Sequence, residues 1–183
     1  MSLTTSTWAR TRRHAARTAV ALAVGAVLLT GCAGAPGTAA VVDGRVITES
    51  ALQRTTAELG RLVPQGIPAQ QVLINLIAAP YLIDAAAEIG AGVSEAEARQ
   101  LAEQLAAQAG LGEVPELGPG SLDVLRATLA QGKISQSQDP GAVFAEFEQE
   151  LAEADVELSP RYGSFDLDAG GIVPTQRDWI DAS

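Results

Sequence analysis

The chain has 183 residues, of which 22 are acidic and 12 are basic, with a single histidine and a single cysteine. All the acidic residues follow Cys32 whereas four basic residues precede it, so the part after Cys32 carries 22 acidic against eight basic side chains. Phosphate backbones and anionic lipids are both bound by Lys and Arg, so this charge argues against a nucleic-acid partner and against electrostatic adhesion to a membrane.

Residues 1–31 have the pattern of a secretory signal peptide. Four arginines between positions 10 and 17 precede an apolar run at residues 18–29. This run is shorter than the roughly 20 apolar residues that a membrane-spanning helix needs. We therefore expect this leader to be removed on export, and we exclude it from the folded domain.

The leader ends in Leu29-Thr30-Gly31-Cys32, which resembles a bacterial lipobox. The pattern predicts cleavage between Gly31 and Cys32 and attachment of acyl chains, such as palmitate, at Cys32. Two acyl chains are enough for stable anchoring, because one chain alone binds membranes only marginally. We expect a protein that is lipid-anchored on the extracytoplasmic face of the cell membrane; the alternative is that Cys32 is a buried structural cysteine.

Export and lipidation would also remove the side chains that most catalytic sites use. The only histidine, His14, lies in the leader, and lipidation would occupy the only cysteine. The mature monomer would then lack the residues for a Ser-His-Asp or Cys-His nucleophile, a disulfide or a zinc site. We predict no catalytic residues, no metal and no cofactor, and a protein that is not an enzyme. A hydrolase built from paired carboxylates has no motif in its favour.

Residues 32–40, rich in Gly and Pro, predict a flexible tether, and residues 41–165 predict one mainly α domain of about five helices. Residues 41–46 indicate a short strand with a tight turn at Asp43-Gly44. Thr48 or Ser50 is the expected cap of the first helix.

The longest apolar run lies between positions 70 and 89 and predicts a helix that needs neighbours on more than one side, or a ligand. Pro80 should kink this helix or break it at Ala79. Gly90 and Gly92 indicate its end, and Ser94 with Glu97 forms a capping-box pattern that opens a third helix extending to about residue 109.

Downstream, the composition predicts a loop at 110–120, a helix from Ser121 to residue 131, a polar loop at 132–140 and a helix at 140–154. Phe144 and Phe147 are expected in the core.

Residues 156–165 alternate like a strand, and we expect this strand to pair with the N-terminal one. Residues 166–183 predict a C-terminal tail. The segment that begins at Asp166 partly matches an EF-hand calcium-binding loop. Position 12 of that loop would be Arg177 rather than the required glutamate, so calcium binding is not expected.

Two segments resemble the N-terminal chaperone domain of the SurA, PrsA and trigger-factor-like foldases. One is Val41-Val42-Asp43-Gly44-Arg45-Val46-Ile47-Thr48. The other comprises Leu76-Ile77, Tyr81-Leu82-Ile83, Ala86, Ile89-Gly90 and Val93-Ser94-Glu95. The resemblance covers residues 41 to about 105, and it departs from the family at Pro80, where a charged helix former is usual.

The resemblance implies a helical domain that binds unfolded or newly exported polypeptides. In these foldases prolyl isomerisation belongs to a separate parvulin domain, for which the remaining chain offers neither the length nor a histidine. We expect a chaperone-like module without isomerase activity; the alternative is an adaptor lipoprotein that binds one folded partner. The expected walls of the binding cradle are Leu73, Leu76, Ile77, Tyr81 and Leu82, and the alternative role of each is core packing.

Overall fold

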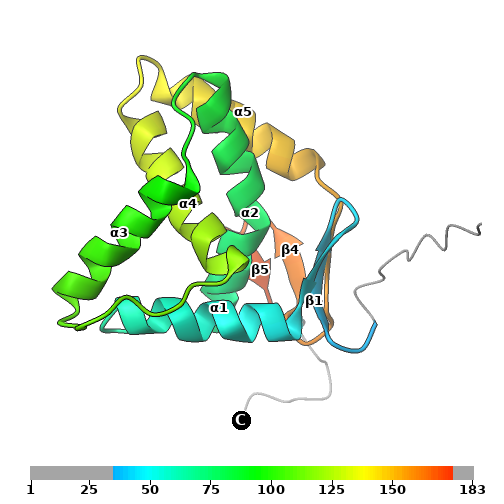
Figure 1. The fold of residues 1–183 in the computed structure, drawn as a ribbon. Coiled ribbons are helices and arrows are strands. Elements are labelled where there is room, and N and C mark those ends of the chain that lie inside the picture. Colours follow the sequence, from blue (N-terminus) through cyan, green and yellow to red (C-terminus); the bar gives the residue numbers. More distant parts are fainter. Residues whose placement is uncertain (1–34, 175–183) are drawn as a thin grey trace, which may run out of the picture.

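The computed structural model describes residues 35–174 (Figure 1), and the predicted signal peptide, the lipobox, Cys32 and Arg177 lie outside them. The described part has five helices and five short strands, which confirms a mainly α fold. The strands are β1 (Thr38–Val42), β2 (Arg45–Thr48), β3 (Val156–Leu158), β4 (Ser164–Asp166) and β5 (Gly171–Val173), and the helices are α1 (Glu49–Leu62), α2 (Ala69–Glu88), α3 (Glu95–Gln108), α4 (Pro119–Ser135) and α5 (Pro140–Glu153). No helix in this part of the chain has the length and apolar character needed to cross a membrane.

Strand β1 is the centre of a three-stranded antiparallel sheet, between β2 and β3 (Figure 1). Asp43 and Gly44 both have positive φ, 48° and 77°, which confirms the predicted tight turn between β1 and β2. The strand begins at Thr38, so the prediction that residues 38–40 belong to a tether is wrong. Ala39 and Ala40 are fully buried because their small side chains fit where the sheet packs on the helices.

The C-terminal strands are shorter and more numerous than the sequence predicted. Only three residues, Val156–Leu158, pair with β1, and Val42 lies opposite Val156. The rest of residues 156–165 does not continue this strand, because the chain turns at residues 160–163 and then forms β4, which pairs with β5. The tail predicted from residue 166 is therefore wrong over its first part: Ile172 of β5 is buried in the core.

Local capping signals placed the starts of α1 and α3 correctly, and the cap of α5, Asp139, was not predicted. Thr48 Oγ1 accepts a hydrogen bond from the Ala51 N–H (3.1 Å) at the start of α1. Ser94 and Glu97 form the complete capping box of α3, and Asp139 accepts from the Ala142 N–H at the start of α5. Each cap satisfies N–H groups that have no partner inside the helix.

Helix α4 is longer than predicted at both ends. Its first turn includes Pro119 and Gly120, and it continues through Gly132 to Ser135. Ser121 is not its cap but a fully buried residue within it, which donates to Glu58 Oε2 of α1. The same carboxylate oxygen accepts from the Gly118 N–H (2.8 Å). The cap at the start of α4 is therefore a side chain of α1, sixty positions earlier in the sequence.

Helix α2 continues through Pro80, so the break expected at Ala79 does not occur. Proline lacks an N–H, which leaves the carbonyl of Leu76, four residues earlier, without its helical donor. Arg45 Nη2, from the β1–β2 hairpin, donates to this oxygen at 3.1 Å. Tyr81 Oη also donates to Asp43 Oδ2 at 2.7 Å. The hairpin therefore supports α2 at its proline.

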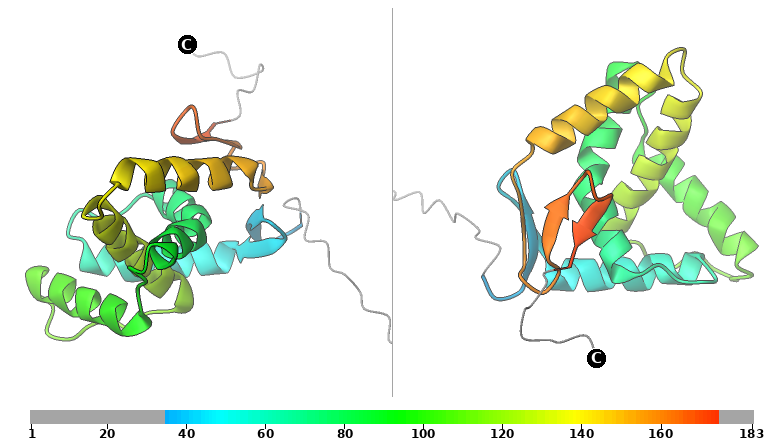
Figure 2. Two further views of the ribbon diagram at one scale, coloured as in Figure 1. Left: turned by 90° about the horizontal axis from the view of Figure 1, so that it is seen from above. Right: turned by 180° about the vertical axis from the view of Figure 1, so that it is seen from behind.

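Helix α2 lies in the middle of the molecule, packed against α1, α4, α5 and β5 (Figure 2). These neighbours account for an apolar sequence on most of its sides. The main core gathers around its first half and includes the fully buried Leu52, Leu62, Leu73 and Ile77. A separate, smaller cluster lies around its second half.

Candidate binding site

The five residues expected to line a cradle do not lie together on a surface. Leu73 and Ile77 are fully buried and Leu76 is 6% exposed, so all three belong to the main core. The prediction was wrong for these residues because α1 and α4 cover the first half of α2. Tyr81 and Leu82 are half-buried; Tyr81 contacts the hairpin and Leu82 packs against the smaller cluster.

The smaller cluster, which we call the second cluster, has a small buried interior and larger, partly exposed residues at its margin. Its buried members are Ala85, Ala86, Val93, Ala130 and Ile134. Its partly exposed members are Leu82, Leu129, Val143, Phe144 and Phe147. The two phenylalanines therefore pack against the core as predicted, but neither is buried. Three of the five buried residues are alanines, so the interior is small and the larger residues at the margin keep some accessible apolar surface.

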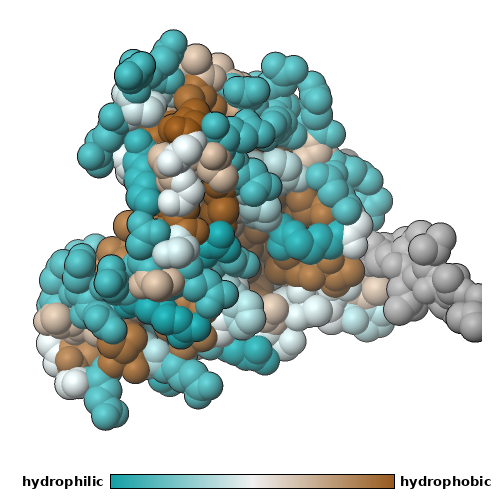
Figure 3. Space-filling view, turned by 45° about the horizontal axis from the view of Figure 1, so that its top comes forward, coloured by the Kyte–Doolittle hydropathy of each residue, from teal (hydrophilic) through white to brown (hydrophobic). Residues whose placement is uncertain are grey.

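A hollow of about 560 Å³ opens beside the second cluster. Its apolar wall consists of Ile89, Ala91, Ala142 and Val143, and residues 133 and 136–139 complete it. Ile89 is 40% exposed, which is high for a large apolar side chain. Figure 3 shows hydrophobic side chains on the upper part of the molecule, bordered by hydrophilic ones. We call the hollow lined by Ile89, Ala91, Ala142, Val143 and residues 133 and 136–139 the apolar hollow.

The wall that contains Ile89 and Ala91 is built by the end of α2. Gly90 has a φ of +74°, and the N–H groups of Gly90 and Ala91 donate to the carbonyls of Ala87 and Ala86. This is the Schellman arrangement, in which a residue with positive φ reverses the chain and satisfies the last carbonyls of the helix. The glycine stop predicted from the sequence therefore places Ile89 outward at the edge of the hollow.

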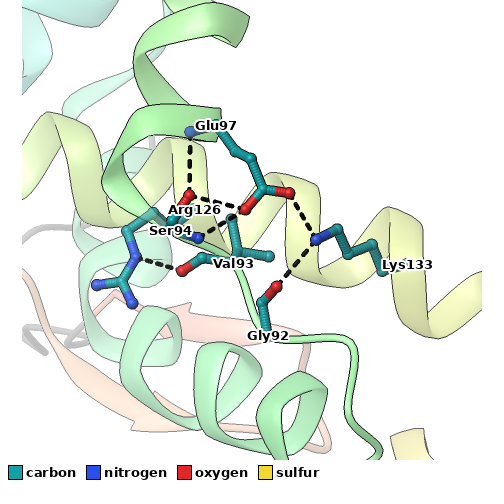
Figure 4. Close-up of polar contacts among 6 residues, drawn as sticks. All are labelled: Gly92, Val93, Ser94, Glu97, Arg126 and Lys133. Carbon is teal, nitrogen blue, oxygen red and sulfur yellow. Dashed lines mark hydrogen bonds and ion pairs between the residues drawn. The ribbon is translucent and has the colours of Figure 1, made fainter.

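Side chains of α4 hold the α2–α3 turn in place (Figure 4). Lys133 Nζ donates to Gly92 O (2.9 Å) and to Glu97 Oε1 (2.7 Å), and Arg126 Nε donates to Val93 O (3.0 Å). Glu97 Oε2 also accepts from the N–H and the hydroxyl of Ser94, both at 2.8 Å. The hydrogen bond from Lys133, followed by those from Ser94, lowers the pKa of Glu97 from 4.5 to about 2. One wall of the apolar hollow is thus fixed by charged hydrogen bonds.

The opposite wall is the start of α5 and the connection that precedes it. The Asp139 cap and Pro140 in the first turn fix the direction of α5, which places Ala142 and Val143 toward the hollow. Ser137 Oγ, also in the lining, is buried and has no hydrogen-bond partner among the described residues. A buried hydroxyl without a partner is costly, and because this oxygen has almost no accessible surface it is not available to a ligand in the hollow.

A second hollow, of about 400 Å³, lies between α2, α5 and the β1–β2 turn, and we call it the acidic hollow. Its lining is Asp43, Tyr81, Asp84, Glu88, Glu150, Glu153 and Ala154. Burial, and then the hydrogen bond to the Asp43 carboxylate, raise the pKa of Tyr81 to about 12. The same hydrogen bond is the main cause that lowers the pKa of Asp43. Within residues 35–174 no group of His, Cys, Asp or Glu side chains is arranged to hold a metal ion.

Sequence reasoning did not identify the apolar hollow, although two of its signals were visible. Ile89 is the last apolar residue before a glycine stop, a position where a helix leaves its neighbours. Val143 lies on the apolar stripe of α5, which buries only Leu151 completely. The two residues are 54 positions apart, so only the packing of α2, α4 and α5 reveals that they share a hollow.

We compared the chain with protein-family models, with curated proteins and with solved structures, and none of the three comparisons gave a match. The arrangement of its own residues therefore carries the functional argument.

Proposed function

We propose that this protein is a chaperone-like binding module that holds apolar segments of newly exported polypeptides in the apolar hollow. The observation that carries the proposal is the incomplete burial of large apolar side chains around a hollow with fixed walls. In a monomer such surface is normally covered, and where it stays open it is typical of a binding site. The resemblance of residues 41–105 to foldase chaperone domains supports the same function.

The shape of this surface favours extended segments over one folded partner. A concave site with a few polar groups suits a chain that inserts side chains, whereas an adaptor would present a broad, flat patch. The exposed side chains of Gln136 and Gln138 in the lining could pair with the backbone of such a segment. We further propose that lipidation at Cys32 keeps the module at the extracytoplasmic face of the membrane, and that it has no isomerase activity.

Peptide binding to the whole protein, reconstituted in lipid nanodiscs, tests the proposal. A fluorescent, uncharged peptide rich in Leu and Phe should bind, with empty nanodiscs as the blank. Ile89→Ser should weaken binding about tenfold or more, because burial of an isoleucine side chain contributes roughly 1.5–3 kcal/mol. The matched control is Leu111→Ser, since Leu111 is exposed to a similar degree, 37%, and lines neither hollow.

An equal loss for Ile89→Ser and Leu111→Ser, or no binding by the wild type, would contradict the proposal. The same preparation should suppress aggregation of an unfolded client without accelerating a proline-limited refolding phase, which takes tens to hundreds of seconds when uncatalysed. Acceleration of that phase would show that a catalytic function had been missed.

A further inference from the structure

The apolar and acidic hollows are neighbours at the end of α2. Glu88 lines the acidic hollow and the next residue, Ile89, lines the apolar hollow. Helix α5 also contributes to both: Val143 lines the apolar hollow, and Glu150 lines the acidic hollow two helical turns later. Residues seven positions apart share a side of a helix, so a ligand along this side of α5 would meet both hollows.

The acidic hollow has five carboxylates in its lining and no basic side chain. The neighbouring Arg45 already donates to Leu76 O, and Lys133 at the apolar hollow is paired with Glu97. None of the ion pairs in the described part of the chain includes Asp84, Glu88 or Glu150. The positive charge of Arg45 acts on Asp43 and offsets part of this charge, and the lining of five carboxylates stays net negative.

This arrangement is unfavourable for the stability of α2. Asp84 and Glu88 are four residues apart, where like charges repel. Glu88 is also the last residue of the helix, where the partial negative charge of the helix dipole disfavours another anion. A fold that needed only stability would favour Lys or Arg in this turn, so the two carboxylates fit a role in recognition better than one in folding.

We infer that the segments held in the apolar hollow carry basic residues, which occupy the acidic hollow beside it; this inference rests on the proposed function. The partner chemistry is a cationic, apolar polypeptide segment: one or two large apolar side chains as anchors, followed or preceded by Arg or Lys. From Val143 to residues Glu150 and Glu153 the helix rises about 11–15 Å. An extended chain covers this distance in about three to five residues, which sets the expected spacing between anchor and charge.

Three peptides with the same apolar anchor test the inference on the whole protein in neutral-lipid nanodiscs. Four residues from the anchor, they carry a pair of Arg, a pair of Gln or a pair of Glu. We expect the Arg peptide to bind about tenfold more tightly than the Gln peptide, and the Glu peptide to bind most weakly. The advantage of the Arg peptide should decrease from 50 mM to 500 mM salt, because partly exposed charges are screened.

Charge-neutral variants locate the effect. Glu150→Gln with Glu153→Gln should bring the affinity for the Arg peptide close to that for the Gln peptide and leave the Gln peptide unchanged. The matched control, Glu148→Gln with Glu103→Gln, removes the same charge from positions that line neither the acidic nor the apolar hollow. It should leave the tenfold ratio intact.

The outcomes separate the two proposals. If the Arg and Gln peptides bind equally and Ile89→Ser weakens both, the apolar binding function stands and the preference for basic segments is wrong. If both pairs of variants reduce Arg-peptide affinity alike, the attraction comes from overall charge and the inference is also wrong. If no peptide binds, both proposals are wrong.

Discussion

The two halves of α2 have similarly apolar sequences but opposite surroundings. In the first half Val72, Leu73 and Ile77 are fully buried in the main core. In the second half the fully or nearly buried residues are alanines, whereas Leu82 and Ile83 are half-buried and Ile89 is exposed. The difference teaches that burial follows from the neighbours and not from the hydrophobicity of the helix itself.

The neighbours of the two halves explain this difference. The first half is surrounded by α1, α4 and β5, and Gln70 Nε2 donates to Ile172 O at its start (3.0 Å). The second half meets the end of α4 and the side of α5, a helix that buries only Leu151 completely. The first half therefore lies in a closed core, while the second half leaves apolar surface accessible, which is the surface that the proposed function uses.

The largest expected difference between the two regions is in the free energy of unfolding. Leu73→Ala should lower it by about 3 kcal/mol, because truncation leaves a cavity in a closed core. Phe144→Ala should cost only about 1 kcal/mol, since a partly buried ring at the margin of a cluster loses less buried area and leaves no closed cavity. Urea denaturation measures both. Equal costs, with unchanged dependence on denaturant, would show that the second cluster is as closed as the main core.

A smaller effect is expected where the hairpin meets α2, at the boundary between its two halves. Arg45→Ala should destabilise the protein by about 1–2 kcal/mol, because the carbonyl of Leu76 loses a charged donor. In a Pro80→Ala background the same substitution should cost much less, since residue 80 then supplies the missing N–H. A double-mutant cycle measures this coupling. Additive effects would mean that Arg45 does not compensate for the proline.

The smallest effect concerns the wall of the apolar hollow at acid pH. The pKa of Glu97 is about 2 in the folded protein against an ordinary value of 4.5. Its stabilising contribution is therefore complete above about pH 4.5 and is lost as the pH falls toward 2. Glu97→Gln should flatten the dependence of the unfolding midpoint on pH in this window. Glu103→Gln, an exposed position on the same helix, is the control and should leave the slope unchanged.

The sequence predicted the parts of the fold that depend on local signals. The caps at Thr48 and Ser94 each act within three residues, so the starts of α1 and α3 could be found from the chain alone. Asp139 caps α5 over the same short distance, although the sequence analysis placed this helix only by its position from residue 140. The start of α4 could not, because its capping carboxylate is Glu58 of another helix. Residues 38–40 were misjudged for a similar reason: alanines in a short segment form a strand only when partners lie on both sides.

The candidate site was less predictable than the fold. An all-round apolar helix has no dominant face, so its pattern did not separate Leu73, which is buried, from Ile89, which is exposed. The apolar hollow also combines the ends of α2 and α4 with the start of α5. Such a site depends on how helices cross, which periodicity does not encode.

The position of β1 between β2 and β3 has a consequence for how the protein reaches its native state. The Asp155 N–H and Asp43 Oδ1 that join the ends of these strands are 112 positions apart. A chain that emerges with its N-terminus first, from a ribosome or an export channel, can form the hairpin at once. It must then wait for residue 158 before the other edge of β1 is paired. Until then that edge is open to strands of other chains, and so large a sequence separation slows the closing step. This protein is therefore itself expected to be vulnerable to aggregation while it is being made.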